Sequence, residues 1–244
     1  MTIRPAPRVS ARRTISSDGS PVTISVSTPA AAAADLIVMG SHGHSGLRKH
    51  FFGSTTERVL RETTRPVLIT PPVDPGPVSL DDAKRILRRV VVPVDLSPAS
   101  RHQAAIAAGL SKAAGVPLIL VHVIEPVKSP LAARLHLAGV EANRRAVAED
   151  ELQAIAAALP PSLHTEALLA YGDPAEELAK VAHDRGAGLV VMGLNGSPVL
   201  GPRMGSVTYR MLCLVHTLVL ALPPERMETL VARATSAAAV AVTK

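Results

Sequence analysis

The sequence predicts an α/β fold: a doubly wound, five-stranded parallel sheet, preceded by a partial copy of the same fold. Residues 86–222 alternate short, continuously apolar segments with segments of helical spacing, as do parallel strands covered on both faces. The unit at residues 35–70 recurs at residues 188–221 as an apolar strand, Met-Gly, a glycine-rich loop, Gly-Ser, a helix and a second strand. We expect the strand order 3-2-1-4-5 in the complete copy.

The elements of the complete copy follow from these patterns in chain order. Continuous apolar runs predict strands at residues 89–94, 117–123, 164–170, 188–192 and 217–222. Helical spacing predicts helices between them at residues 100–114, 131–159, 174–185 and 205–215. Gly115 ends the first helix, and Asp173 with Pro174 provides the N-cap and first turn of the third.

The composition divides the chain into five parts. Residues 1–20 form a disordered basic tail, residues 21–72 a half-domain and residues 73–85 a linker rich in proline and glycine. Residues 86–222 form the complete domain, and residues 223–244 an Ala/Val-rich tail. The half-domain has a candidate strand at residues 22–26 but no counterpart of residues 89–123, so it looks like the second half of a domain. Either the first half has been lost or the start codon is assigned wrongly, and the sequence alone does not decide between the two.

The composition also excludes several classes of function. Two Tyr, two Phe and no Trp leave few aromatic faces for stacking nucleic-acid bases, so we expect no nucleic-acid partner despite the net charge of +6. No apolar run reaches the roughly 18 residues of a membrane helix, so we expect no membrane partner. The single cysteine, Cys213, cannot form an intramolecular disulfide, which favours a cytoplasmic location.

The candidate site is predicted where the strand order reverses, beyond the carboxyl ends of the strands. There Asp95 should meet the glycine-rich loop that begins at Gly193 and ends at Gly205-Ser206. Small residues before a helix N-terminus favour a phosphate group, although such a loop can also serve only to reverse the chain. Asp95 could accept hydrogen bonds from a ribose or help to hold a divalent cation, or it could cap the next helix as Ser97 and Ser100 could.

The chain resembles the universal stress protein family in five segments, which occur in this order and spacing: VVVPVDLS, LILVHVIEP, YGDPAEEL, LVVMGLNG and MGS. The resemblance covers residues 86–222 as one domain and residues 35–70 as half of another, and it implies an α/β fold of the adenine-nucleotide-binding type. ATP-binding members of that family carry Gly-x2-Gly-x9-Gly-Ser/Thr. The first copy matches this spacing fully with Gly40, Gly43, Gly53 and Ser54. The second copy has eight residues in place of nine, including Pro198 and Pro202, so the intact loop belongs to the copy without an Asp95.

The resemblance also implies a set of nucleotide-binding positions. Pro93, Val94 and Asp95 would lie along the nucleoside, and the backbone of Val123 would contact adenine. The phosphates would be surrounded by Met192, Gly193, Asn195, Gly196, Gly205, Ser206 and Val207. The implied cofactor is ATP, with Mg²⁺ as a companion ion.

The leading hypothesis is a cytoplasmic universal stress protein that binds ATP or a related adenine nucleotide as a regulatory ligand. The alternative is a member that binds no nucleotide and acts through protein association.

No catalytic base or nucleophile stands out, so at most slow ATP hydrolysis is expected. His42, His44 and His50 form a poor ligand set, so no metal site is expected. Family members commonly dimerise through their last strands; the matching residues, 66–70 and 217–222, should therefore pair within the chain or in a homodimer.

Overall fold

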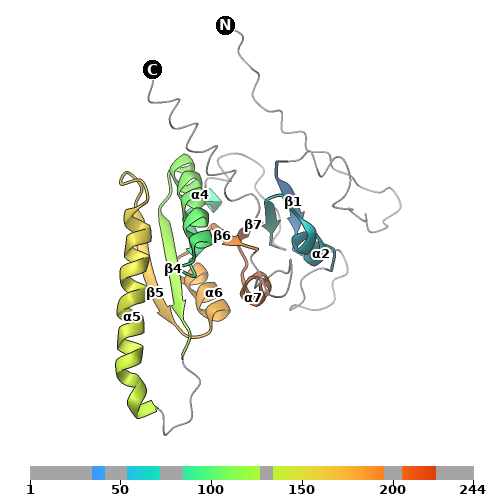
Figure 1. Ribbon diagram of the computed structural model, residues 1–244. Helices are drawn as coiled ribbons and strands as arrows, with labels where there is room; N and C mark the ends of the chain where they lie inside the picture. Colours follow the sequence, from blue (N-terminus) through green and yellow to red (C-terminus); the bar gives the residue numbers. More distant parts are fainter. Residues whose placement is uncertain (1–34, 42–53, 72–84, 127–133, 195–204, 224–244) are drawn as a thin grey trace, which may run out of the picture.

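The computed structural model describes residues 35–41, 54–71, 85–126, 134–194 and 205–223 (Figure 1). The partial copy contributes β1 (Ile37–Gly40), α2 (Ser54–Glu62) and β2 (Val67–Thr70). The complete copy contributes β3 (Val90–Pro93), α4 (Pro98–Ala114), β4 (Leu118–Ile124), α5 (Arg134–Ala157), β5 (Thr165–Tyr171), α6 (Pro174–Asp184), β6 (Leu189–Gly193), α7 (Ser206–Leu214) and β7 (Leu218–Leu222). The predicted basic tail, the strand at residues 22–26, the linker up to residue 84 and the tail from residue 224 lie outside the described residues.

All seven described strands form one sheet in the order β1-β2-β7-β6-β3-β4-β5. Within the complete copy this is the predicted order 3-2-1-4-5, and its strands are parallel, which confirms the predicted fold. The pairing predicted for the two last strands occurs within the chain. β2 pairs with β7 in antiparallel register, with Leu68 opposite Leu220, and this ladder joins the two copies.

The ends of the elements differ from the predicted ends by a few residues, for local reasons. α4 begins at Pro98, two residues early, because the Ser97 side chain accepts a hydrogen bond from the Ser100 N–H and so caps the helix. β6 begins at Leu189 rather than residue 188. At Gly188 the chain passes so close to the Ile86 carbonyl oxygen that a Cβ would lie 1.9 Å from it, so only glycine fits.

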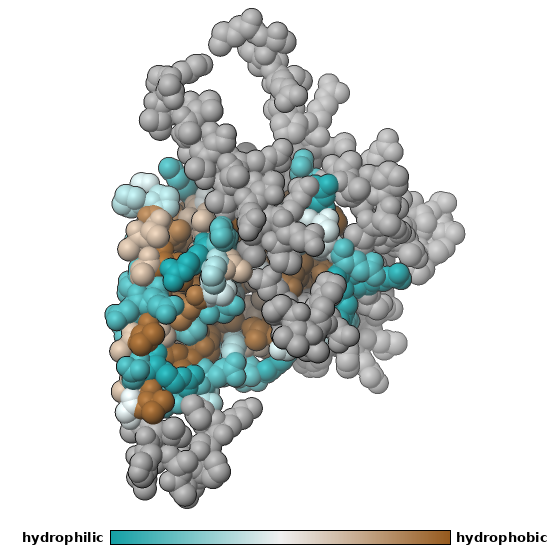
Figure 2. Space-filling model, in the orientation of Figure 1, coloured by the Kyte–Doolittle hydropathy of each residue, from teal (hydrophilic) through white to brown (hydrophobic). Residues whose placement is uncertain are grey.

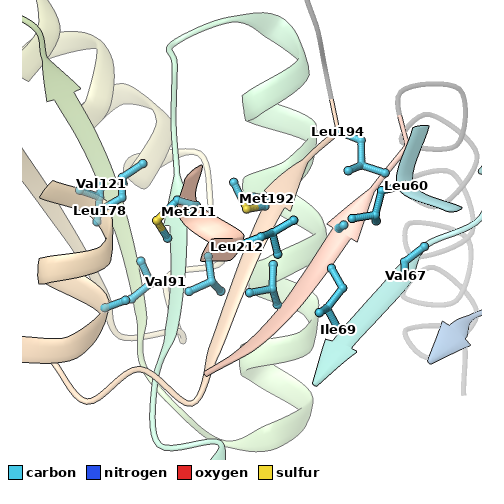
Figure 3. Packing of buried hydrophobic residues seen from close by; sticks show 14 of the residues in the cluster. Leu60, Val67, Ile69, Val91, Val121, Leu178, Met192, Leu194, Met211 and Leu212 are labelled. Carbon is cyan, nitrogen blue, oxygen red and sulfur yellow. The ribbon is translucent and has the colours of Figure 1, made fainter. Parts of the chain in front are cut away.

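The helices cover the two faces of the sheet as two layers. α4 and α5 pack on one face, where Ala104, Ala107 and Leu152 are buried against the strands. α2, α6 and α7 pack on the other face. The core on this second face continues without a break across the β2–β7 boundary, where Leu60 and Ile69 of the partial copy join Met211 of the complete copy (Figure 3). The two copies therefore share one hydrophobic core.

α5, with 24 residues, is the longest helix described, and it lies on the surface over β4 and β5. It exposes Val140 and Val147, and Figure 2 shows that hydrophobic residues on this side of the molecule are separated by hydrophilic ones. Such scattered apolar residues are normal at a protein surface. Within the described parts of the chain, no helix combines the length and the apolar character needed to cross a membrane.

The shared core predicts that damage to the partial copy destabilises the whole chain. Ile69 is only 2% exposed, so Ile69→Ala should lower the free energy of unfolding by about 2–5 kcal/mol. Urea unfolding should also keep a single transition, because both copies depend on the same core. Val140→Ala, at an exposed position of α5, is the control and should stay within about 0.5 kcal/mol of the wild type. A separate early transition in the wild-type chain would contradict the shared core.

Candidate functional site

The candidate site is a cleft at the carboxyl ends of β3 and β6, where the strand order reverses. β3 and β6 are paired at two positions, Val90 with Leu189 and Val91 with Val190. Beyond them the cleft has a volume of about 490 Å³, within the usual range for small-molecule sites. Its position is the one predicted from the strand order.

Nine of the eleven predicted nucleotide-binding positions line this cleft: Pro93, Val94, Asp95, Val123, Met192, Gly193, Gly205, Ser206 and Val207. Asn195 and Gly196 lie outside the described residues. In the partial copy, Gly40 ends β1 and Ser54 begins α2. Gly40 is not among the described residues that line the cleft, and Gly43 and Gly53 are outside the described residues. The structure thus brings together residues about 100 positions apart; their contact with a nucleotide stays a prediction.

Asp95 is held in a sharp turn between β3 and α4. Its Oδ1 accepts hydrogen bonds from the Ser97 N–H at 3.0 Å and from the Ser97 hydroxyl at 2.5 Å. Burial raises the pKa of the Asp95 carboxyl, but these hydrogen bonds outweigh burial and hold the pKa below its ordinary value. Leu96 adopts a φ of +65° within this turn, a conformation that costs a leucine some strain. Ser97, not Asp95, is the N-cap of α4, so the capping alternative for Asp95 is wrong.

The Gln103 side chain bridges the two strands where they separate, a role that the sequence analysis did not identify. Its Nε2 donates to the carbonyl oxygens of Pro93 on β3 and Val191 on β6, each at 2.9 Å. Gln103 is buried and lines the cleft. A sign of this role was available in the sequence, because Gln103 is a large polar residue on the alanine-rich face by which α4 packs on the sheet.

His122 satisfies the carbonyl of Val94, the residue directly after β3. Its Nδ1 lies 2.7 Å from the Val94 carbonyl oxygen. Because a carbonyl oxygen only accepts, Nδ1 must carry the proton, and Nε2 is the ring nitrogen left for other partners. The floor of the cleft is therefore fixed by polar side chains from α4 and β4.

The start of α7 forms the opposite wall. Gly205 is its N-cap and has no side chain, so no side-chain capping bond is made to the first N–H groups of the helix. The Thr208 hydroxyl donates to the Gly193 carbonyl at 3.1 Å and so ties the helix to the end of β6. In the partial copy Thr56 makes the same bond to Gly40 at 3.0 Å. The shorter loop of the second copy therefore leaves the connection between strand and helix unchanged.

The charged side chains in the described wall of the cleft are carboxylates, Asp95 and Glu125. No group of three or more His, Cys, Asp or Glu residues that could hold a metal is found among the described residues. His42, His44 and His50 lie outside them. An anionic ligand would therefore meet the positive end of the α7 dipole rather than a basic side chain of this described wall.

An exposed ion-pair cluster joins the helices beside the cleft. Arg210 of α7 donates to Asp173 at 2.6 Å and to Glu176 of α6 at 3.1 Å. Asp173 is also the predicted N-cap of α6, which is confirmed, and it accepts from the Glu176 N–H at 3.2 Å. The hydrogen bond from Arg210, followed by that from the Glu176 N–H, lowers the pKa of the Asp173 carboxyl.

Comparison with known proteins confirms the predicted resemblance. The model of the universal stress protein family matches residues 2–71 and 87–223, so the first match begins upstream of residue 21. A universal stress protein of Thermus aquaticus is 30% identical over 116 residues, 48% of this chain and 83% of that protein. One from Synechocystis is 58% identical over 36 residues, and the chain covers only 12% of its length. A crystal structure of a universal stress protein from Pseudomonas aeruginosa superposes with a TM-score of 0.56 at 18% identity, over 84% of this chain and 69% of that one.

Gln103 should be needed to hold the diverging strands. Gln103→Leu keeps a similar volume but removes the donor from one buried and one partly buried carbonyl group, so the free energy of unfolding should fall by about 2–4 kcal/mol. Arg101→Ala, two residues away on the exposed side of α4, should change it by less than about 0.5 kcal/mol. Urea unfolding measures both variants. A Gln103→Leu protein as stable as the wild type would contradict the bridging role.

The Asp173–Arg210 pair should make stability depend on acid pH. The pKa of Asp173 in the folded protein lies below its ordinary value of 3.8, so the carboxylate stabilises the fold above that value. This contribution is lost as the pH falls through the folded pKa. Asp173→Asn keeps a capping side chain but removes the charge. The wild type should therefore have the higher Tm at about pH 6, and the difference should shrink as the pH falls below the ordinary value of 3.8 and through the lower pKa of the folded protein.

Arg210→Gln removes the partner of Asp173 and should give the same dependence of Tm on pH as Asp173→Asn. Thermal melts of the three proteins across this range make the comparison. A difference in Tm between wild type and Asp173→Asn that stays constant down to the lowest pH would contradict the role of the ion pair.

Proposed function

Because the chain belongs to the universal stress protein family, we propose that residues 86–222 form a complete domain that binds ATP or a related adenine nucleotide as a regulatory ligand. One observation carries the proposal. The residues that the family resemblance assigns to a nucleotide come from β3, β4, β6 and α7, and nine of them line one cleft. Residues 21–72 are then the half-domain that extends the sheet of this domain.

The nucleoside end of the proposed site is formed by β3 and β4. Asp95 is ionised at neutral pH, and its orientation is fixed by Ser97, so it can accept hydrogen bonds from ribose hydroxyls. Val94, Val123 and Leu178 give the cleft an apolar wall against which a purine ring can pack.

The phosphate end is formed by β6 and α7. Gly193 and Gly205 have no side chains, so phosphate oxygens can approach the backbone N–H groups closely. The Ser206 hydroxyl and the N-terminus of α7 add donors and a favourable dipole. Since Asp95 and Glu125 are both acidic, a nucleotide accompanied by Mg²⁺ suits this wall better than a free polyphosphate.

We propose a ligand that regulates rather than a substrate that is turned over. The sequence contains no Ser-His-acid series and no paired carboxylates placed for hydrolysis, so slow ATP hydrolysis is the most that we propose. The single cysteine fits a cytoplasmic location. A homodimer through the last strands is not needed, because β2 and β7 already lie inside the sheet of one chain.

A second candidate is a protein that binds no nucleotide and acts through protein association. The observation that favours it is the shorter loop of the second copy, in which Pro198 and Pro202 have no N–H to offer a phosphate. A direct measurement of nucleotide affinity separates the two candidates.

Asp95→Ala should weaken nucleotide binding while the fold is retained. Loss of a charge-assisted hydrogen bond costs roughly 1.5–3 kcal/mol, or about 10- to 150-fold in Kd. Isothermal titration calorimetry with ATP and Mg²⁺ measures this change, and a thermal melt checks the fold. Asp184→Ala, exposed at the end of α6, is the control and should bind as the wild type does. Wild-type affinity for ATP weaker than about 1 mM would favour the second candidate.

A further inference from the structure

One face of the sheet is covered by helices over only part of its width. α4 packs on β3, β4 and β6, and α5 packs on β4 and β5. In the described part of the chain no helix of this layer extends over β1 and β2 (Figure 1). We name the part of this face formed by β1, β2 and β7 the open face.

The internal repeat shows what the open face lacks. By the match of LIVMG with LVVMG, Leu36 corresponds to Leu189, and Val38 to Val191. Leu189 and Val191 are 7% and 0% exposed, whereas Leu36 and Val38 are 44% and 60% exposed. In the complete copy this position is covered by α4, whose contact surface is formed largely by alanines. The open face therefore exposes residues of the type that the complete copy buries under an alanine-rich helix.

The exposed residues belong to a continuous apolar row. Val38 lies opposite Leu68 in the β1–β2 ladder, and Leu68 lies opposite Leu220 in the β2–β7 ladder. Leu68 and Leu220 are half-buried and pack against the core on the α4 side of the sheet. An apolar row across three neighbouring strands has the shape that the side of one helix can cover.

The segment that follows β7 starts within reach of this row. Residues 224–244, which lie outside the described residues, begin two positions after Leu222, the last residue of β7. Because β7 is antiparallel to β2, the carboxyl end of β7 lies at the same end of the sheet as the first residues of β1 and β2. The chain therefore leaves β7 beside the first residues of β2, one strand away from Leu36.

The sequence of this segment is that of an amphipathic, alanine-rich helix. It opens with Pro224 and Glu225, a proline and an acid suited to a first helical turn. At 100° per residue, one face of about 120° carries only apolar side chains: Met227, Leu230, Val231, Ala234, Ala238, Ala241 and Val242. The charged residues of the segment all lie outside this face.

We propose that residues 224–244 fold as a helix that docks on the open face and takes the place that α4 occupies in the complete copy. Its 21 residues would span about 30 Å, ample for three strands spaced about 4.8 Å apart. Small residues let such a helix approach the sheet closely, as Ala104 and Ala107 of α4 do. This inference is independent of nucleotide binding.

Amide hydrogen exchange on the full chain, followed by mass spectrometry, tests the docking. In the wild type, amides of residues 226–242 should exchange at least about tenfold more slowly than in an unstructured peptide. Val38→Asp on the open face and Leu230→Asp in the segment should each remove this protection. Val140→Asp, at an exposed position of α5, is the matched control and should leave it in place.

Protection of the amides of β3 and β4 reports whether each variant is folded, and if Val38→Asp unfolds the sheet, Leu230→Asp decides. The proposal is overturned if residues 226–242 exchange at unstructured rates in the wild type, or if their protection survives the deciding variant. Light scattering identifies the other possible occupant. A doubled mass together with an unprotected segment would mean that a second copy of the chain covers the open face, which also overturns the proposal.

Discussion

The antiparallel ladder between β2 and β7 is the contact on which the rest of this structure depends. Two parallel strands and one helix, the elements described in the partial copy, bury too little apolar surface to fold alone. By pairing with β7, the partial copy gains a neighbour for its sheet edge and a share of the core beneath α6 and α7. The same ladder moves β7 from the edge of the complete copy into the interior of a seven-stranded sheet. The pairing thus covers the exposed edge of the complete copy, and it buries the apolar residues of the partial copy on the face that carries α2.

The cleft follows from a second constraint, the divergence of β3 and β6. The chain leaves β3 towards one side of the sheet and leaves β6 towards the other, so the two strands separate after a short ladder. Separation opens a space for a ligand, but it also leaves backbone carbonyls without ladder partners. Gln103 supplies a donor for one carbonyl on each strand, and His122 supplies one for the carbonyl of Val94, directly after β3. Both side chains also line the cleft, so the groups that satisfy these carbonyls form part of its wall.

The two copies preserve the connection from strand to helix. The bond from Thr56 to Gly40 is repeated by Thr208 and Gly193, although the loop between them is one residue shorter in the second copy. A buried hydroxyl that satisfies the last carbonyl of the strand restricts the position of the helix more than loop length does. The difference between the loops is thus confined to residues between the strand end and the helix start.

The sequence by itself predicted the strands of the complete copy, their order and the location of the cleft. Apolar runs and repeats report these features because burial of a parallel strand and reversal of strand order follow from local pattern and topology. The N-cap at Asp173 could also be predicted from the sequence, because an N-cap depends on residues that are neighbours in the chain. The family resemblance suggested that the two last strands pair, and the tertiary structure decided that they do so within the chain. Tertiary structure decided the bridge from Gln103 to Val191, 88 residues away, the tie from Arg210 to α6, and the exposure of Val38 where Val191 is buried. Neither the two contacts nor the exposure of Val38 could be inferred from the sequence pattern alone. The contacts depend on which distant segment the fold places beside the residue, and the exposure depends on the lack of a described helix over Val38.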